Sequence, residues 1–161
     1  MSSHDRAIAA LDSAGIEYAV TRHGRVGSLA EAAAARGVLP RDIIKTLVVR
    51  LSEDAYVLVL VPGDREISWP RLRALLGVNR LSMPDAATAA EVTGYERGTI
   101  TPWGAAHTRT GATWPVIADA SIPGRTVSMG AGEHGVAVTV DAHAMLAALD
   151  AQVAEVSEAA G

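Results

Sequence analysis

The chain has 161 residues, a formal net charge of −4 and no cysteine. Its length fits one domain with an ordinary hydrophobic core, and the lack of cysteine excludes disulfides, thiolate nucleophiles and zinc–thiolate sites. We expect a soluble cytoplasmic protein that contacts neither membrane nor DNA, because no signal peptide or membrane span is recognisable and the acidic balance suits only a small site for one nucleic-acid end.

The first third of the chain is predicted to alternate helices and strands. Apolar residues at helical spacing predict a helix over 3–14, and a strand follows over 18–21. A second helix begins after Ser28, because Ser28 and Glu31 form a capping box in which each side chain binds the other residue's free backbone N–H group. Gly37 ends this helix, since glycine readily adopts the left-handed conformation that follows a helix C-terminus.

The middle of the chain is predicted to form a β-hairpin followed by two short helices. A helical turn at Pro40 leads into two β-rich runs, 45–51 and 56–61, and the short polar segment between them favours an antiparallel hairpin. Proline opens each of the next two helices, which are expected over 70–76 and 84–91.

The remaining strands are short. They are predicted over 80–82, 116–118, 126–129 and 136–140. Asp141 then caps a final helix, and the polar tail from Gln152 onward is expected to fray. Many short strands with helices at both ends and few long crossovers predict one α+β domain, with a mixed, mostly antiparallel sheet and flanking helices.

Lys45 is the first candidate for a functional residue, because it is the only lysine against thirteen arginines. In a chain with this bias, lysine is expected mainly where the guanidinium fork cannot replace a compact ammonium with three rotatable donors. Lys45 stands near the start of an apolar strand, and strand ends often carry functional side chains. The alternative is a solvated strand-end lysine without a role in function.

The segment 94–104 combines three glycines and a proline with little periodicity. Glycine lets the main chain approach a ligand closely, and Pro102 restricts the exit angle of the loop. The N–H groups between these residues can then point at an anionic or developing oxyanion centre. The segment is therefore a candidate site loop, and the alternative is an ordinary surface loop.

A second glycine-rich segment, 130–135, matches the Gly-x-Gly-x-x-Gly pattern of dinucleotide-binding sites. That pattern needs a helix after it, because the helix N-terminus receives the pyrophosphate. The residues that follow, 136–140, are typical of a strand instead. We therefore interpret the segment as a tight turn between two strands, with its backbone available to line a pocket.

No other pattern identifies a catalytic group. Asp119 ends an apolar strand, where its carboxylate either caps the following turn or faces the site. The histidines His23, His107, His134 and His143 lack metal-ligand spacing, and no Ser-His-Asp arrangement is recognisable. The sequence therefore predicts neither a metal site nor a protein nucleophile.

Taken together, these features resemble the YbaK/EbsC and prolyl-tRNA synthetase insertion-domain family, which are aminoacyl-tRNA deacylases. The most specific part of the resemblance is the lysine at the strand start followed by the Gly98-x-x-x-Pro102 loop. The other matching features, in the same order along nearly the whole chain, are His23, the alanine-rich helix 28–37, the strand 116–119 and the Gly132-x-x-Gly135 turn. The resemblance implies that residues 1–161 form one editing domain.

In that family the lysine and the loop line the pocket that holds the 3′ end of a mischarged tRNA. The resemblance therefore implies catalytic roles for Lys45, Gly98, Thr99, Ile100 and Pro102. It also implies substrate-binding roles for His23, Thr46, Thr101, Asp119, Ser128, Gly130, Ala131 and Gly132. It implies no cofactor and no protein nucleophile, because hydroxyl or thiol groups of the substrate assist. His134 departs from the family, since many members carry a basic residue at this turn position.

The implied function is trans-editing, the hydrolysis of mischarged tRNA(Pro) that carries alanine, cysteine or another small amino acid, with prolyl-tRNA synthetase as a candidate partner. One alternative is a non-catalytic module that binds a tRNA end or a synthetase with the same fold. The other is a nucleotide-binding oxidoreductase, suggested by the glycine pattern. Lys45 and the intact Gly98-x-x-x-Pro102 loop favour the deacylase over the first, and the strand after Gly135 disfavours the second.

Overall fold

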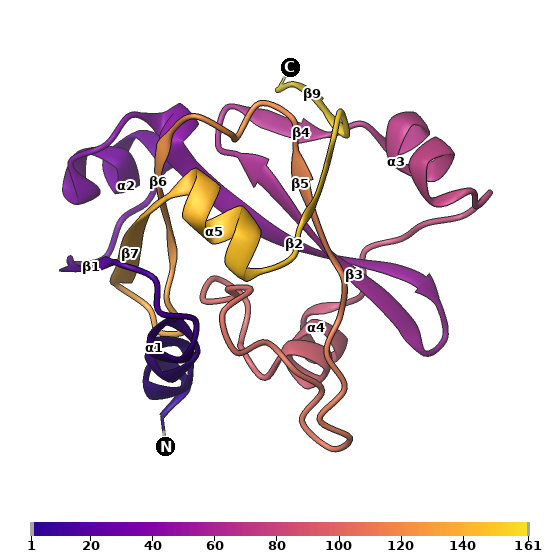
Figure 1. Cartoon of the computed structure of the whole chain (residues 1–161), viewed down its shortest axis with the longest axis horizontal. Coiled ribbons are helices and arrows are strands. Elements are labelled where there is room, and N and C mark those ends of the chain that lie inside the picture. Colours follow the sequence, from indigo (N-terminus) through magenta and orange to yellow (C-terminus); the bar gives the residue numbers. More distant parts are fainter. Residues whose placement is uncertain (1, 161) are drawn as a thin grey trace.

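One large sheet runs through the molecule in the computed structural model, which describes residues 2–160 (Figure 1). Its strands lie in the order β1 (Ala19–Arg22), β7 (Val136–Asp141), β6 (Thr126–Gly130), β2 (Ile43–Ser52), β3 (Ala55–Pro62), β5 (Val116–Asp119) and β8 (Gln152–Ala154). A second, two-stranded sheet pairs β4 (Arg65–Ile67) with β9 (Ser157–Ala159). Four of the seven strand pairings are antiparallel, so the predicted mixed, mostly antiparallel sheet is confirmed.

Within residues 2–160 the helices are α1 (Ser3–Ser13), α2 (Leu29–Arg36), α3 (Trp69–Leu76), α4 (Ala86–Thr93) and α5 (Ala142–Ala148), with a 3₁₀ turn, η1 (Pro40–Asp42), before β2. None of these helices is long and apolar enough to cross a membrane. Because successive side chains of a strand point to opposite faces, β2 and β3 contribute to two hydrophobic clusters. One cluster contains Leu11 of α1, Val92 of α4 and Met145 of α5, and the other contains Leu72 of α3.

Local sequence signals predict where several helices begin or end. Asp141 Oδ2 accepts a hydrogen bond from the Ala144 N–H group at 2.9 Å, which confirms the predicted start of α5. Gly37 ends α2 with a φ of 71°, a left-handed conformation that side chains disfavour. The predicted hairpin is β2–β3, in which Leu47 lies opposite Val59.

Half of the predicted capping box is wrong. Ser28 Oγ accepts a hydrogen bond from the Glu31 N–H group at 3.1 Å, as expected. The Glu31 carboxylate, however, accepts from the N–H group of Gly27 at 2.7 Å and not from that of Ser28. The side chain therefore reaches one residue further back and fastens the chain that enters the helix.

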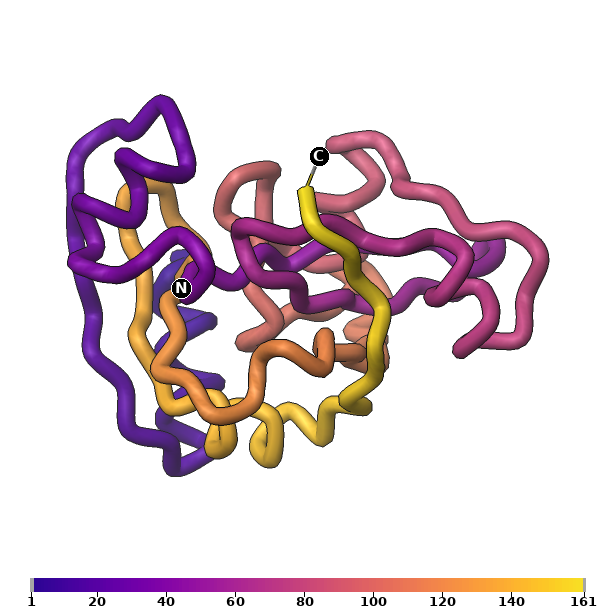
Figure 2. The backbone as a smooth tube through the Cα atoms, turned by 90° about the horizontal axis from the view of Figure 1, so that it is seen from above, coloured from indigo at the N-terminus to yellow at the C-terminus, as the bar shows by residue number. Residues whose placement is uncertain are grey.

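The C-terminal tail is ordered, so the expectation that it frays from Gln152 onward is wrong. It forms β8 against β5 and β9 against β4, and Figure 2 shows the yellow segment crossing the molecule after α5. Val156 is fully buried in this segment, and burial of its side chain together with the strand pairing of β8 and β9 opposes the entropy cost of ordering the tail. The expected strand over 80–82 is also wrong, because only Ser82 pairs, in a single bridge with Arg50.

Candidate functional site

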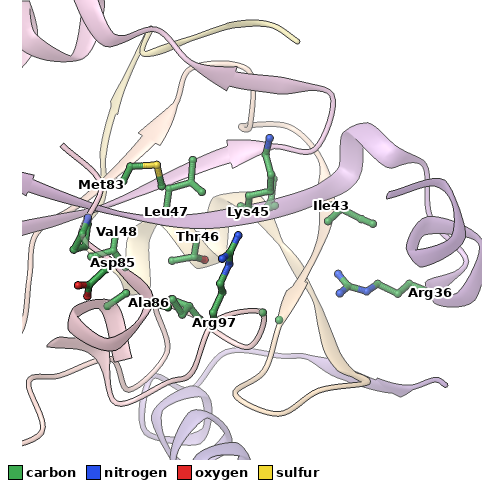
Figure 3. A pocket seen from close by; sticks show the side chains of 16 residues that line it. Arg36, Ile43, Lys45, Thr46, Leu47, Val48, Met83, Asp85, Ala86 and Arg97 are labelled. Carbon is green, nitrogen blue, oxygen red and sulfur yellow. The ribbon is translucent and has the colours of Figure 1, made fainter. Parts of the chain in front are cut away.

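A pocket of about 740 Å³ opens beside β2, a volume typical of small-ligand sites. One wall is β2 from Ile43 to Val48 (Figure 3). The opposite wall comes from the segment 83–86 and Ala89, which includes the start of α4, and from Arg97, Gly98 and Ile100 of the loop after α4. Arg36 of α2 and Gly130 of β6 complete the lining.

The pocket lies along an open stretch of the β2 edge. On the side away from β3, Ile44 pairs with Met129 of β6, and Arg50 exchanges two backbone hydrogen bonds with Ser82. Alternate residues of a strand direct their N–H and C=O groups to the same side, so Thr46 and Val48 present theirs at this edge. Neither has a strand partner there within residues 2–160. The pocket therefore offers unpaired backbone donors and acceptors.

Two polar side-chain atoms of the pocket lining are buried without a hydrogen-bond partner. They are Thr46 Oγ1 and Arg36 Nε, and among residues 2–160 only His23 Nε2 shares this condition. A buried polar atom without a partner costs about 1 to 3 kcal/mol, so such atoms point to a role that the folded chain alone does not explain. Their position in the pocket marks Thr46 and Arg36 as candidate ligand contacts.

Lys45 lines the pocket, but its ammonium and the side chain of Thr46 point to opposite sides of β2 (Figure 3). Lys45 Nζ donates a hydrogen bond to the backbone oxygen of Arg65 at 2.5 Å, which leaves two donors free. Burial lowers the pKa of Lys45, and the nearby carboxylates of Glu66 and Asp64 oppose this effect. Lys45 is thus a partly desolvated cation at the pocket wall.

The loop after α4 faces Thr46 across the pocket. Gly98 has a φ of 90°, and a side chain there would meet His134 at 3.1 Å. Thr99 is buried and anchors the loop, since its N–H and hydroxyl both donate to the backbone oxygen of Glu96. Within residues 2–160 the N–H groups of Gly98 and Ile100 donate to no protein acceptor. Because both residues line the pocket, these N–H groups are candidate donors to a ligand.

The buried C-terminal part of the candidate loop stabilises the loop conformation without lining the pocket. Thr101 and Pro102 are buried and absent from the pocket lining. Thr101 Oγ1 accepts a hydrogen bond from the Trp103 N–H group at 3.5 Å, and the Tyr95 hydroxyl donates to the Trp103 backbone oxygen at 2.5 Å. These contacts hold the exit of the loop against the core.

The β6–β7 turn reaches the pocket only at its first residue. Gly130 lines the pocket, whereas Ala131 is fully buried and accepts a hydrogen bond from His4 at 2.9 Å. Gly132 lies under α1, where an added Cβ would stand 2.7 Å from the Ser3 backbone oxygen. The strand β7 follows this turn, which confirms the predicted strand and leaves the glycine pattern without the helix that a dinucleotide-binding motif needs.

Three more predicted residues lie outside the pocket lining. Ser128 is buried, and its hydroxyl lies 3.4 Å from a terminal nitrogen of Arg36. The backbone N–H group of His23 donates a hydrogen bond to the backbone oxygen of Gly135 at 2.8 Å. Asp119 is only 3% exposed and caps the turn after β5 by accepting from the Ser121 N–H group at 3.1 Å. Of the two roles open for Asp119, the structure supports the cap.

The charge of the pocket is positive although the chain is acidic overall. Arg36, Lys45 and Arg97 line it, and none of them forms a salt bridge within residues 2–160. Asp85 is the single acidic residue of the lining, and its carboxylate accepts from the Thr88 N–H group at 2.8 Å as the cap of α4. The site therefore suits an anionic or strongly polarised ligand.

Sequence reasoning singled out neither Arg36 nor the segment 83–86, and it included Arg97 only as part of the candidate loop 94–104. No local pattern distinguishes these residues, because the pocket joins β2, α2, α4 and the following loop across long sequence separations. In residues 2–160 no group of three His, Cys, Asp or Glu side chains is placed to hold a metal ion.

Comparison with protein families identifies the chain. Residues 23–147 match the family model described as the aminoacyl-tRNA editing domain, and this match includes the whole pocket lining. The chain belongs to the aminoacyl-tRNA editing domain family. The resemblance inferred from Lys45 and the Gly98-x-x-x-Pro102 loop is thereby confirmed at the level of the family.

Curated relatives and solved structures agree with this family. Proline–tRNA ligases of Thermosipho africanus and Bacillus licheniformis are 41% and 34% identical over 69 and 79 residues, which are 43% and 49% of this chain. The matched stretches are only 12% and 14% of those synthetases. A crystal structure described as a candidate trans-editing enzyme for prolyl-tRNA synthetase has a TM-score of 0.85 and 25% identity, with 98% of each chain covered. A hypothetical protein with 24% identity and a TM-score of 0.83 has the same fold, over 95% of this chain and 99% of its own.

Proposed function

We propose that this protein, as one editing domain over its whole length, is a trans-editing deacylase that hydrolyses the ester of mischarged tRNA in the cytoplasm. The observation that carries the proposal is the pocket at the open edge of β2, where unpaired donors of the strand and of the Gly98 loop face each other in a chain of the editing family. The proposed substrate is tRNA(Pro) carrying alanine, cysteine or another small amino acid. Partial matches to proline–tRNA ligases support this choice.

The proposed chemistry needs positioning more than a strong nucleophile, because an aminoacyl ester is already activated. A water molecule, or a hydroxyl or thiol of the substrate, attacks the ester carbonyl. Negative charge then develops on the carbonyl oxygen, where the free N–H groups of Gly98 and Ile100 can stabilise it. The ester C–O bond breaks and the terminal ribose hydroxyl leaves with a proton.

Residues around the loop divide the remaining tasks in this proposal. The unpartnered hydroxyl of Thr46 orients the ester or the attacking group from the opposite wall. Lys45 binds the polar part of the substrate on the other side of β2, with the two donors that Arg65 leaves free. Thr99, Thr101 and Pro102 hold the loop backbone, and Ser128 supports the neighbouring Arg36.

Deacylation of a panel of charged tRNA(Pro) tests the function. Ala-, Ser-, Cys- and Pro-tRNA(Pro) are incubated with the protein, with and without prolyl-tRNA synthetase, and the remaining ester is measured. We expect hydrolysis of the mischarged species while Pro-tRNA(Pro) survives. Tight binding of the tRNA end without hydrolysis of any ester would favour the non-catalytic module instead.

The same panel separates the two sources of the nucleophile. Attack by the substrate thiol predicts cleavage of Cys-tRNA(Pro) alone. Attack by water predicts graded activity across alanine, serine and cysteine, because an apolar pocket discriminates a single methylene by only about 1 to 3 kcal/mol. We favour water, since the lysine and the loop do not depend on a thiol in the substrate. A covalent acyl-protein intermediate, detected by mass spectrometry, would contradict both routes.

A further inference from the structure

Arg36 is a cation in the pocket for which residues 2–160 supply no anion within salt-bridge distance. It is the last residue of α2, and its side chain extends into the pocket region shown in Figure 3. Its Nε atom is buried and has no hydrogen-bond partner among the described residues. Its one hydrogen bond is to the neutral hydroxyl of Ser128, at a long 3.4 Å.

Arg36 differs from two other arginines of the chain, Arg125 and Arg65, in the partners of its guanidinium. Arg125 lies 3.9 Å from the carboxylate of Asp42 and donates to a backbone oxygen at 2.7 Å, and Arg65 makes two hydrogen bonds to Ser157. Arg36 has no carboxylate within salt-bridge distance in residues 2–160. A desolvated charge without a partner lowers the stability of the fold, so this position makes physical sense when a bound ligand supplies the negative charge.

The lining around Arg36 indicates which kind of anion fits. Three cations, Arg36, Lys45 and Arg97, border the pocket, whereas Met83, Pro84, Ala86 and Ala89 give its other part an apolar surface, interrupted by Asp85, whose carboxylate caps α4. A terminal nucleotide likewise has a charged part and an apolar surface, because it combines an anionic phosphate with a flat base that has apolar faces. A guanidinium is suited to phosphate, because its planar fork can donate two parallel hydrogen bonds.

We propose that Arg36 is an oxyanion-binding residue of the pocket, which receives a phosphate group next to the 3′-terminal nucleoside of the bound RNA. This proposal rests on the proposed function, which brings an RNA end to the pocket. Arg36 thereby sets the depth to which the RNA end enters, and so places the ester between Thr46 and the Gly98 loop. It is a binding and positioning residue and takes no part in bond making.

Binding of adenosine 5′-monophosphate and of adenosine tests this assignment without any need for hydrolysis. The two dissociation constants are measured by NMR titration for the wild type, Arg36→Gln, Arg36→Lys and Arg41→Gln. Arg41 is the matched control, because it is exposed, lies outside the pocket lining and changes the net charge equally. We expect the wild type and the Arg41 variant to prefer the monophosphate by about tenfold, the value of a charge-assisted hydrogen bond.

The Arg36→Gln variant should lose that preference, and Arg36→Lys should retain part of it. An unchanged preference in Arg36→Gln would overturn the proposal. So would a selective loss of hydrolysis of Asp- or Glu-tRNA in that variant, because the guanidinium would then bind an acidic amino acid and not a phosphate. Wild-type protein that binds the monophosphate through Arg36 but cleaves no ester would refute the deacylase function and leave the phosphate site intact.

Thermal unfolding of Arg36→Met provides a second, independent readout. If the guanidinium serves a ligand, its replacement by an apolar side chain of similar length should leave the unfolding midpoint unchanged or raise it, since a part-buried cation with an unpartnered Nε atom is removed. A midpoint lowered by more than about 5 °C would assign Arg36 a structural role and overturn the proposal.

Discussion

The molecule contains two polar clusters that are built in opposite ways. At the C-terminal side, Asp119 accepts hydrogen bonds from Ser121 and from the Val156 N–H group, while Arg65 and Arg71 donate to Ser157. At the pocket, Thr46 and Arg36 carry buried atoms without partners. Buried polar groups with hydrogen-bond partners stabilise one native arrangement. Buried polar groups without partners lower stability, and a bound ligand can supply the missing partner. Whether its buried polar atoms have partners therefore distinguishes a residue that stabilises the fold from one that we propose to contact the substrate.

The largest expected effect comes from breaking the satisfied cluster. Asp119→Ala leaves the Val156 N–H group and the Ser121 hydroxyl without their acceptor in a buried environment. We expect the free energy of unfolding to fall by about 3 kcal/mol, measured by urea denaturation at pH 7. Asp54→Ala, on the exposed hairpin turn, is the control and should change stability by less than about 0.5 kcal/mol. Equal effects of the two substitutions would contradict the comparison.

The same cluster predicts a pH dependence. Burial alone would raise the pKa of Asp119, but hydrogen bonds from Ser121, Ser157 and Val156 outweigh it and lower the pKa below 3.8. The folded state therefore binds fewer protons than the unfolded state, and stability from this carboxylate is present above pH 3.8 and is lost as the pH falls through the folded pKa. The stability advantage of the wild type over Asp119→Asn should shrink in that acidic window.

Removal of the Lys45 ammonium should affect function far more than stability. We expect Lys45→Ala to lower kcat/KM for deacylation about 100-fold, because loss of a cation that binds and positions the substrate misplaces the ester. The free energy of unfolding should change by less than about 1 kcal/mol, because the Lys45 ammonium makes one hydrogen bond and no salt bridge within residues 2–160. Lys45→Arg should also be impaired, and full activity in that variant would show that the single lysine is not functionally special.

The Gly98 loop provides a matched pair of glycines. Gly98 and Gly111 have φ values of 90° and 74°, so valine strains the backbone at both positions. Gly98 lines the pocket and an added side chain there also meets His134, whereas Gly111 is outside the lining and an added Cβ meets no described atom within 4 Å. We expect a loss of kcat/KM of about 30-fold for Gly98→Val and of less than about threefold for Gly111→Val, in single-turnover assays. Equal activities would make the loop an ordinary surface segment.

The smallest expected effect comes from one hydroxyl. Thr46→Val keeps the shape of the side chain and removes the unpartnered Oγ1 atom, so the free energy of unfolding should stay the same or rise by up to about 1 kcal/mol. The value of kcat/KM should fall by about tenfold, since a hydrogen bond to the substrate is lost. Thr139→Val, on β7 and outside the pocket lining, should leave activity unchanged. Loss of stability in Thr46→Val would place Thr46 with the structural residues.

The sequence alone determined the parts of this protein that depend on neighbours along the chain. The caps at Ser28 and Asp141, the glycine that ends α2, the β2–β3 hairpin and the turn at 130–135 all follow from local backbone preferences and short-range hydrogen bonds. The same holds for Lys45, the Gly98-x-x-x-Pro102 loop and the other matching segments, whose order along the chain together predicted the family that the family model confirms.

Only the tertiary structure decided which of these residues share the pocket. In the structure, the side chains of Lys45 and Thr46 lie on opposite sides of β2 (Figure 3). Asp119 and Gly132 are buried and lie outside the pocket lining, whereas Arg36 reaches the pocket from α2. The tertiary structure also ordered the C-terminal tail, whose buried residues are too few to form a recognisable pattern but find partners in β4 and β5. These outcomes depend on contacts between distant segments, and local propensity contains no information about which segments meet.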